Sequence, residues 1–330
     1  EKTGEFENAE EVALPWSGLP GSRLRRLFFE LPKTAVKSGA DIVVEPAHFG
    51  PLNLPQHIKR VTVIHDMTVF LFPQHHVFLS QFLQRAFLPR ILKKTHHILT
   101  DSASTAADLN RLFPFTSDKT SSVLLGKDER FRPCEDAGVL AKYGVRPPYL
   151  LYVGTLEPRK NVGTLIRAFN EFKDKTGMPH QLVLTGAKGW KSDPIFQAIQ
   201  ESPVRDAILL TGYVERELLP ILYSMAELFV YPSEYEGFGL PVLEAMACGT
   251  PVITSDVSSL PEVGGTAARY VAPQSADQLA EQMVMLCSDP ALRATCRQQG
   301  LEQAQRFTWE DTATEVVRVF DRLRPEGQAS

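Results

Sequence analysis

Several features that would define other protein classes are missing from this sequence. No segment approaches the roughly 18 uninterrupted apolar residues of a membrane-spanning helix, although 43% of the 330 residues are hydrophobic. The chain begins at Glu1 without a methionine or a signal-peptide pattern, so we expect a processed or trimmed chain. Its four cysteines form no CxxC pair and no metal-ligand spacing with histidine, which favours a reducing cytoplasm and no metal site. A net charge of −4 argues against a general nucleic-acid binder.

The charge is distributed unevenly along the chain. Residues 1–147 carry 19 Lys and Arg against 16 Asp and Glu, whereas residues 148–330 carry 16 against 23. Two basic groups lie in the front part, at 23–37 and 85–94, and phenylalanines flank the second. A solvated helix face packed on a core explains these groups, and we favour that interpretation. Peripheral contact with the anionic inner face of a membrane is the alternative.

Short apolar runs alternate with helical stretches from residue 22 onwards. This alternation predicts right-handed βαβ crossovers and parallel sheets, and the length favours two domains. We expect two doubly wound domains, 1–147 and 148–308, with a proline-bounded linker at 132–148. The expected strands are 41–45, 60–65, 97–100, 121–125, 149–153, 181–185, 207–211, 228–231, 252–254 and 268–271, and the expected helices include 23–38, 77–94, 104–112 (with Ser104 as a plausible N-cap), 164–173, 217–226, 275–287, 291–305 and 309–323.

The stretch 228–256 combines a buried strand, a glycine-rich loop and a short helix. Gly237 and Gly239 allow the loop backbone a positive φ or a close approach to a ligand. We expect the helix to begin at about Leu240. Its N-terminus would present the N–H groups of Gly239, Leu240 and Val242, which suits an anion.

Two carboxylates accompany this helix end. Glu236 lies in the loop and Glu244 in the helix, and helical side chains lean toward the N-terminus, so both could face one ligand. A phosphate with hydroxyl-rich groups on either side would satisfy them. Glu234 competes with Glu236 as the loop carboxylate, and the residues alone do not separate the two.

The loop 154–161 also follows an expected strand, where parallel sheets bind their ligands. It places Arg159 and Lys160 at a helix start with Asn161 as the expected N-cap. Two cations are unfavourable there unless an anion such as a pyrophosphate is bound. A solvated surface pair is the alternative. Loops 186–190 and 212–214 offer backbone groups for a flat base, although ordinary turns explain them as well.

His65 and Asp66 end the expected strand at 60–65. Asp66 would either fix the tautomer of His65 or cap the turn. We single out His65 because it ends a buried strand beside an aspartate. We expect structural roles for the other histidines considered, which are His48, His75, His76, His96 and His97.

Residues 236–244, EGFGLPVLE, resemble the E-x7-E motif of the retaining GT-B glycosyltransferases of group 1 type, glycosyltransferase family four. The similarity covers most of the chain, through VIHDMTVFLFP, ILTDSASTAADL, LYVGTLEPRKNVGTLIRAF, TGYV, PEVGG and FTWEDTA. The resemblance implies two Rossmann-like domains facing a cleft, with acceptor bound mainly in front and donor mainly behind. It also implies that the last segment, 309–330, crosses back to the front domain.

The resemblance also implies roles for individual residues. Glu236 would contact the donor hexose, which favours it over Glu234, and Glu244 would hydrogen-bond the ribose. Arg159 and Lys160 would hold the diphosphate. The remaining implied contacts are His65 to the hexose, the main chains of Phe238, Gly239 and Leu240 to sugar and phosphate, the Val214 main chain to the base, and Gly237, Gly154 and Asp66 around the donor.

The implied activity is metal-independent, retaining transfer of a hexose from a UDP- or GDP-sugar to a glycan or lipid-linked glycan in polysaccharide biosynthesis. GDP-mannose and UDP-glucose are the expected donor types, and no cofactor is expected. The family opens with a strand and a glycine-rich loop that we do not find, since Gly18 and Gly21 follow no convincing strand. We therefore expect the front domain to lack its first βα unit. This departure keeps two alternatives open, a nucleotide-sugar binding protein without turnover and a GT-B epimerase. A dinucleotide dehydrogenase is disfavoured because no GxGxxG follows a strand.

Overall fold

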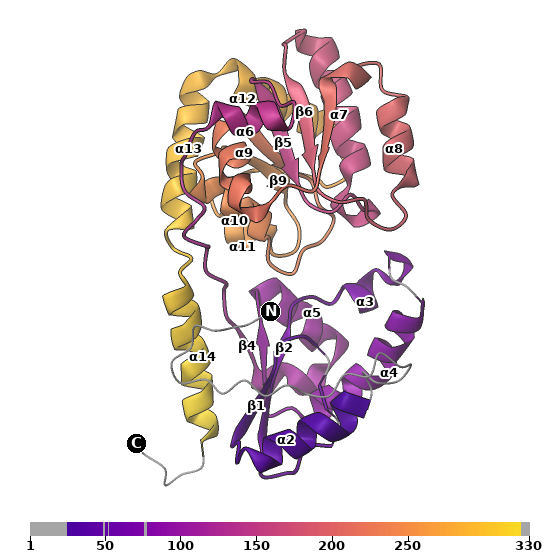
Figure 1. Cartoon of the computed structure of the whole chain (residues 1–330), viewed down its shortest axis with the longest axis vertical. Helices are drawn as coiled ribbons and strands as arrows, with labels where there is room; N and C mark the ends of the chain where they lie inside the picture. Colours follow the sequence, from indigo (N-terminus) through magenta and orange to yellow (C-terminus); the bar gives the residue numbers. More distant parts are fainter. Residues whose placement is uncertain (1–24, 49, 52, 76–77, 325–330) are drawn as a thin grey trace.

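Two parallel sheets organise the chain (Figure 1). The computed structural model describes residues 25–48, 50–51, 53–75 and 78–324. The front domain carries four strands in the order β1-β2-β3-β4, and the back domain carries six in the order β10-β9-β8-β5-β6-β7. The two-domain α/β prediction is confirmed. The expectations for Gly18, Gly21, Arg23, His76 and Val77 lie outside the described residues.

The front strands form where short apolar runs were expected, and neighbouring strands pair in parallel. No strand lies among the described residues 25–41, where a π-helical turn, η1 (Arg26–Glu30), leads into α2 (Leu31–Lys37). The other elements are β1 (Ile42–Glu45), β2 (Lys59–Ile64), α3 (Thr68–Leu71), η2 (Pro73–His75), α4 (Phe78–Lys94), β3 (His97–Thr100), α5 (Ala103–Leu112), η3 (Pro114–Lys119) and β4 (Thr120–Ser122).

The N-cap of α5 differs from the expectation. Ser104 was expected to cap this helix, but Ser102 has the extended backbone of an N-cap and its Oγ accepts from Thr105 N at 3.0 Å. Ser102 fits this role because the side chain of an N-cap residue accepts from the N–H of the third helical residue, which here is Thr105. The helix therefore begins immediately after the carboxyl end of β3, at Ala103.

The order in which the chain adds strands to the back sheet reverses between β5 and β8, and we call this the point where the back sheet changes direction. From β5 the chain builds β6 and β7 on one side, then returns to build β8, β9 and β10 on the other. The strands are β5 (Tyr149–Val153), β6 (Gln181–Thr185), β7 (Ile208–Gly212), β8 (Leu228–Tyr231), β9 (Val252–Ser255) and β10 (Arg269–Val271). The helices are α6 (Ala137–Lys142), η4 (Pro158–Lys160), α7 (Val162–Thr176), α8 (Asp193–Gln200), η5 (Arg205–Ala207), η6 (Arg216–Leu218), α9 (Leu219–Met225), α10 (Leu240–Ala247), α11 (Leu260–Gly264), α12 (Ala276–Ser288), α13 (Pro290–Ala304) and α14 (Trp309–Leu323).

The chain crosses between the domains earlier than expected. Val123 packs in a core of the front domain, whereas Phe131 already belongs to the core of the back domain. The predicted linker at 132–148 is therefore not a free connector. It contains α6, and its apolar side chains Leu140 and Val145 are buried in the back domain. The crossing itself is made by the residues between Val123 and Phe131.

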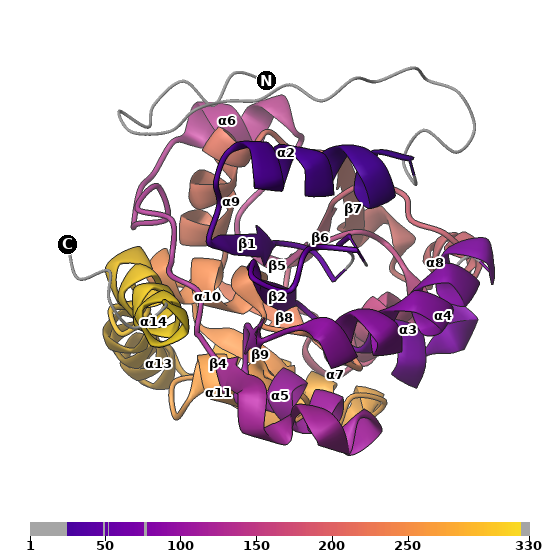
Figure 2. The same ribbon diagram turned by 90° about the horizontal axis from the view of Figure 1, so that it is seen from below.

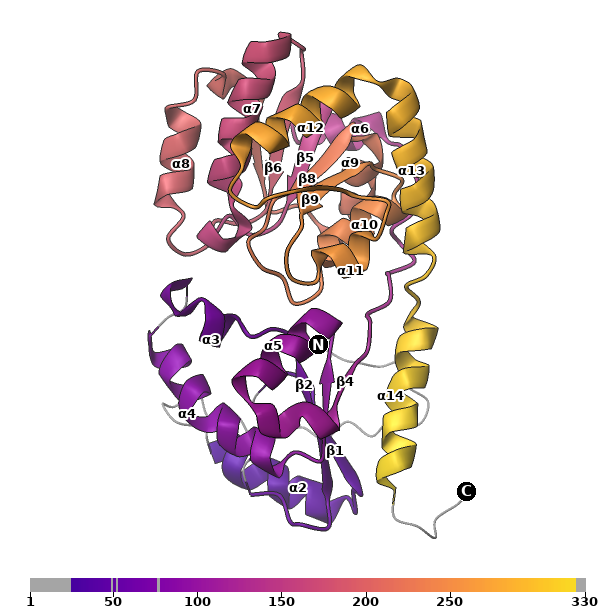
Figure 3. The same ribbon diagram turned by 180° about the vertical axis from the view of Figure 1, so that it is seen from behind.

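The last helix, α14, returns to the front domain (Figure 3). Val319 packs with Val61, Leu99 and Val123, and Thr312 Oγ1 donates to Leu124 O at 2.7 Å. This helix covers one face of the front sheet, and α4 covers the other (Figure 2). The return explains why the helix carries apolar residues on one side although it follows the back domain in sequence.

Membrane-spanning structure is not found in the part of the chain that is described. None of the helices there is long and apolar enough to cross a bilayer.

Candidate active site

Three of the expected site residues meet at the point where the back sheet changes direction. Arg159 and Lys160 lie in η4 after β5, and Glu236 lies in the loop after β8. Lys160 Nζ donates to Glu236 Oε1 at 2.6 Å, and Arg159 Nη1 lies 3.4 Å from Glu236 Oε2. When the connections that follow two neighbouring parallel strands run to opposite sides of the sheet, the loops after those strands separate and leave a crevice. Such folds bind their ligands in this crevice.

This charged group is buried rather than solvated. The side chains of Arg159 and Lys160 are 16% and 12% exposed, and that of Glu236 is 11% exposed. Burial alone would raise the pKa of Glu236, but the Lys160 and Arg159 cations outweigh it and lower that pKa below its ordinary value. The alternative of a solvated surface pair for the two cations does not fit this environment.

Side chains around Glu236 hold its carboxylate in place. Ser233 Oγ donates to Glu236 Oε1 at 2.6 Å, and Tyr231 OH donates to the same oxygen at 3.0 Å. Lys160 Nζ also donates to Tyr231 OH at 2.7 Å. Sequence reasoning missed Tyr231 and Ser233. Their position at the carboxyl end of β8 was the available signal, because a strand end in a parallel sheet points into the ligand region.

His65 lies at the carboxyl end of β2, as expected, but its partner is not the neighbouring aspartate. His65 Nδ1 lies 2.7 Å from Asp101 Oδ2, and His65 Nε2 lies 2.7 Å from Pro46 O. Asp66 caps the turn instead, because its Oδ1 accepts from Thr68 N at 2.8 Å. The hydrogen bond that His65 donates to the Asp101 carboxylate is the main reason why the pKa of His65 is raised above its ordinary value.

Two front-domain residues, Asp101 and His48, contact His65, and sequence reasoning did not predict either contact. Asp101 follows β3, and His48 lies in the loop after β1. His48 Nε2 accepts from His65 N at 2.7 Å, and the two rings lie 5.6 Å apart between centroids. The structural role expected for His48 holds in one sense, since it orders the backbone of His65. The rule that loops after parallel strands carry the site would have found both residues.

The glycine-rich loop brings the two domains into backbone contact. A Cβ on Gly237 would lie 1.9 Å from His65 O, so this position requires glycine for close approach. Gly239 precedes α10 with φ of 119°, a conformation that favours glycine. The expectation for Val242 is wrong, because its N–H donates to Gly239 O at 3.0 Å and is used inside the first helical turn.

Glu244 lies on α10 and is mostly buried. Its Oε2 accepts from Tyr223 OH at 3.1 Å, and its Oε1 lies 3.9 Å from Arg216 Nη2. Burial raises the pKa of Glu244 to about 7. A carboxyl group with this pKa changes protonation near neutrality, unlike Glu236, which lies between two cations. The two glutamates of the motif therefore have opposite electrostatic environments.

The remaining expected residues of the back domain lie in loops or at helix starts that follow its strands. Asn161 occupies the N-cap position of α7 with a left-handed backbone, but its side chain makes no capping bond. Gly154 follows β5 with φ of 156°, and its N–H donates to Thr185 O at 2.9 Å. Three further residues complete the set: Val214 and Phe238 are buried, and Leu240 is 37% exposed.

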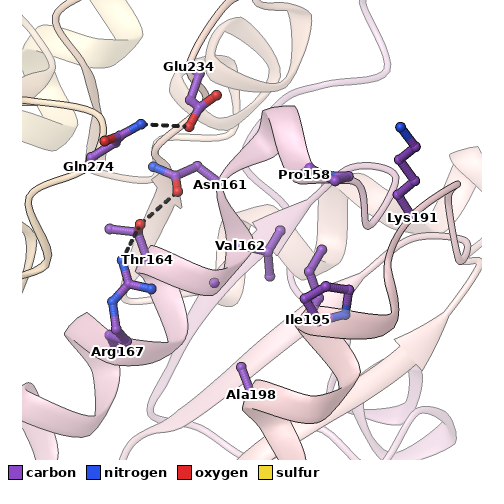
Figure 4. A pocket seen from close by; sticks show the side chains of 12 residues that line it. Pro158, Asn161, Val162, Thr164, Arg167, Lys191, Ile195, Ala198, Glu234 and Gln274 are labelled. Carbon is purple, nitrogen blue, oxygen red and sulfur yellow. Dashed lines mark hydrogen bonds between the residues drawn. The ribbon is translucent and has the colours of Figure 1, made fainter. Parts of the chain in front are cut away.

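Glu234 faces a different part of the molecule from Glu236. It lines a pocket of about 440 Å³ beside the N-terminal turn of α7, and Gln274 Nε2 donates to its Oε1 at 3.2 Å (Figure 4). Asn161, Thr164 and Arg167 form a hydrogen-bonded row next to Gln274 and Glu234 (Figure 4). The structure therefore brings Glu236, and not Glu234, into contact with the side chains of Arg159 and Lys160.

One cysteine lies in a polar cluster that sequence spacing did not predict. Ligand atoms of Cys287, His180 and Glu227 lie within 4.8 Å of one another. The cluster precedes β6 and β8, at the opposite end of the sheet from the loops described above. Arg293 Nη1 lies 3.2 Å from Glu227 Oε1, and His180 Nε2 lies 3.1 Å from Glu227 Oε2. Because a guanidinium already neutralises the carboxylate, we interpret the cluster as an ion-pair network.

Sequence comparison identifies the family of the chain. A profile of the family described as glycosyl transferases group 1 matches residues 141–303. The O-antigen chain mannosyltransferase B of Escherichia coli is 36% identical over 275 residues, which are 82% of this chain and 72% of that protein. The serotype-specific mannosyltransferase WbdA of Escherichia coli is 28% identical over 284 residues. The match spans 82% of this chain but 34% of the longer WbdA.

Structural comparison supports the same fold. Anabaena HepE in complex with UDP-glucose superposes with a TM-score of 0.73 at 17% identity, over 92% of this chain and 84% of HepE. This likeness extends over both domains, which confirms the expected GT-B arrangement. With a 36% identical relative and a matching family profile, the chain belongs to the group 1 glycosyltransferases.

Proposed function

We propose that this glycosyltransferase is a retaining, metal-independent hexosyltransferase. It moves mannose from a nucleoside-diphosphate mannose, with GDP-mannose as the expected donor, to a glycan or lipid-linked glycan in polysaccharide biosynthesis. The observation that carries the proposal is the buried group of Arg159, Lys160 and Glu236 where the back sheet changes direction. The choice of mannose rests on the mannosyltransferase relatives, one of which is 36% identical.

The two cations match the charge that appears during transfer. When the bond between the anomeric carbon and the diphosphate breaks, negative charge grows on the departing diphosphate. Arg159 offers a planar fork and Lys160 a compact charge, and α10 begins four residues after Glu236, to which both cations are paired. These groups supply the stabilisation that a metal ion provides in other transferases, so we propose transfer without a metal.

The proposed reaction keeps the configuration of the donor. The acceptor hydroxyl attacks the anomeric carbon on the face that the diphosphate leaves, and its proton passes to a departing phosphate oxygen. Glu236 steadies the hexose and the developing positive charge without forming a covalent bond to the sugar. His65, held by Asp101, contacts the hexose from the front domain. Glu244 hydrogen-bonds the ribose hydroxyls.

A panel of UDP- and GDP-sugars tests the proposal directly. The purified chain is incubated with each sugar nucleotide and a mannan or lipid-linked oligosaccharide acceptor, and products are read by mass spectrometry and NMR. We expect mannose transfer from GDP-mannose with an α linkage. A β-linked product contradicts retention, and a clear preference for another sugar contradicts the donor assignment.

The same panel separates the two alternative functions. A binding protein without turnover would bind sugar nucleotides in calorimetry and yield neither transfer nor slow donor hydrolysis. An epimerase would release free nucleotide and an altered sugar without any acceptor. Addition of EDTA tests the metal-independent mechanism, because we expect the transfer rate to stay unchanged.

The front domain also carries a basic and partly apolar surface suited to a membrane-bound acceptor. Phe28 and Phe87 pack at 5.9 Å between ring centroids and join η1 to α4, and Phe29 on η1 and Phe82 on α4 are 57% and 59% exposed. We extend the proposal to peripheral contact with anionic lipid through this surface. Sedimentation with phosphatidylglycerol vesicles at low salt should pull the chain down, and recovery in the supernatant contradicts the contact. The exposed basic residues of α2 and α4 are Lys33, Lys37, Arg85, Arg90, Lys93 and Lys94.

A further inference from the structure

Helix α5 of the front domain makes hydrogen bonds to the glycine-rich loop of the back domain, which carries Glu236. Ser102 Oγ donates to Gly237 O at 2.7 Å, and Thr105 Oγ1 donates to the same carbonyl at 3.2 Å. One turn further along, Tyr235 OH donates to Asp108 Oδ2 at 2.9 Å. Tyr235 and Gly237, the two neighbours of Glu236 in the chain, are therefore both bonded to one front-domain helix.

A glutamate of the back domain caps the same helix. Glu262 lies on α11, and its carboxylate accepts from Ala103 N at 2.8 Å and from Ser104 N at 2.7 Å. These N–H groups belong to the first turn of α5, where the helix itself supplies no acceptor. A carboxylate at a helix N-terminus also gains from the helix dipole. The contact is thus a pair of charge-assisted bonds that joins the two domains.

The segment that carries Glu262 also holds the loop of Glu236. Glu236 N donates to Ser258 Oγ at 2.9 Å, and Ser259 Oγ donates to Glu236 O at 2.9 Å and to Phe238 O at 2.6 Å. Residues 258–262 therefore contact the donor-side loop through two serines and the front domain through one glutamate. A shift of this segment would move both together.

Helix α5 is connected in turn to His65. The helix begins two residues after Asp101, and Asp101 Oδ2 lies 2.7 Å from His65 Nδ1. Gly237, whose carbonyl accepts from Ser102 at the start of α5, also lies in close backbone contact with His65 O. The position of His65 relative to the loop of Glu236 thus depends on how firmly α5 is held.

We propose that Glu262 is a positioning residue for transfer. Its carboxylate bonds to α5, which is linked through Asp101 to His65. We propose that this contact keeps the two domains at the distance at which His65 and Glu236 can both contact the same donor sugar. The inference rests on the proposed function for its kinetic readout. Glu262 is not proposed to touch donor or acceptor. Its loss should therefore spare donor binding, which depends on Arg159 and Lys160, and reduce the rate of the chemical step.

The test compares Glu262→Gln with a matched control. The glutamine keeps the size of the side chain but loses its charge and turns an N–H₂ group toward a helix N–H. The control, Glu302→Gln, changes an exposed glutamate on α13 of the same domain. Tyr235→Phe removes a different interdomain bond to α5, the one to Asp108, and serves if Glu262→Gln does not fold.

We expect Glu262→Gln to lower kcat about tenfold, the size expected for loss of a charge-assisted hydrogen bond. The Kd for GDP, measured by calorimetry, should stay within about twofold of the unaltered chain. The radius of gyration of the Glu262→Gln variant in small-angle scattering should increase, because a contact between the two domains is lost. Tyr235→Phe should change the same quantities in the same direction but less, and Glu302→Gln should change none of them.

An unchanged kcat together with an unchanged radius of gyration for a folded Glu262→Gln variant would overturn the inference. A loss of GDP affinity equal to the loss of kcat would also overturn it, because Glu262 would then act in donor binding. Failure of the unaltered chain to transfer any sugar contradicts the proposed function instead. In that case the radius of gyration still decides whether Glu262 holds the domains together.

Discussion

The two domains differ both in the size of their apolar cores and in the arrangement of their buried charges. The back domain has one large, continuous core, and its strands β5, β6 and β8 are buried throughout. The front domain divides its apolar side chains between two small clusters on the two faces of a four-stranded sheet. The back domain holds a buried cluster of two cations and one carboxylate where its sheet changes direction, whereas the front domain buries a single ion pair, Glu45 and Arg60, between β1 and β2.

Two buried glutamates make the contrast specific. Glu236 of the back domain faces two cations, and they lower its pKa although burial opposes this. Glu45 of the front domain faces the single guanidinium of Arg60 at 2.9 Å, and burial raises its pKa to about 7. One buried partner thus fails to offset desolvation where two succeed. Each of the following variants tests one side of this contrast.

The largest effect is expected at the back-domain charge cluster. Glu236→Gln should lower the transfer rate about a thousandfold, because a preorganised charge at the reacting centre is lost. Glu234→Gln is the matched control two residues away, and we expect its rate to stay within about twofold. Steady-state kinetics with GDP-mannose measures both, and circular dichroism checks folding. Equal rates for the two variants would contradict the assignment of Glu236.

A smaller effect is expected from the front domain. Both ring nitrogens of His65 face acceptor oxygens, so we expect the imidazolium to be the working form. Activity should then fall as pH rises through the raised pKa of His65. Asp101→Asn should lower that pKa, move the alkaline limb of the kcat profile to lower pH and reduce kcat about tenfold. An unmoved limb would show that His65 does not set it.

The smallest effect on activity is expected at Glu45. Its pKa is raised in the fold, from 4.5 to about 7, so its stabilising contribution is present below about pH 4.5 and is lost as pH rises through about 7. The free energy of unfolding should fall over this window by roughly 3 kcal/mol more than in Glu45→Gln. Urea unfolding at several pH values measures the difference.

A control is needed because Glu45→Gln leaves a buried guanidinium unpaired. The double variant Glu45→Gln/Arg60→Met removes both charges and should show the same flattened pH dependence without the added destabilisation. If the single and double variants retain the full pH dependence of the unaltered chain, another group causes it.

Most of the fold followed from local patterns in the sequence. The strands β3, β5, β6 and β8 and the helix α14 have the predicted bounds, since buried parallel strands are continuous apolar runs. Short helices such as α3, α6 and α11 were not predicted, because four to six residues carry too little periodicity. The linker prediction failed for a related reason. Prolines around α6 mark its ends but do not reveal that Leu140 is buried.

The site was predictable where residues share a loop and less so where they come from different strands. Arg159, Lys160 and Glu236 were found because each follows a buried strand and carries charge beside a helix start. Asp101 was missed because its partner, His65, is 36 residues away and Asp66 offered a nearer candidate. Glu262 stands further still, 159 residues from Ala103. Contacts of this range depend on domain packing, which local patterns do not contain.

The division of roles between the domains is tested most directly by calorimetric binding of GDP to two variants. If the back domain binds the diphosphate and the front domain positions His65 against the donor sugar, Lys160→Ala should weaken GDP binding at least about tenfold. His65→Ala should bind GDP like the unaltered chain while losing transfer. The account is contradicted if His65→Ala loses GDP affinity and Lys160→Ala retains it.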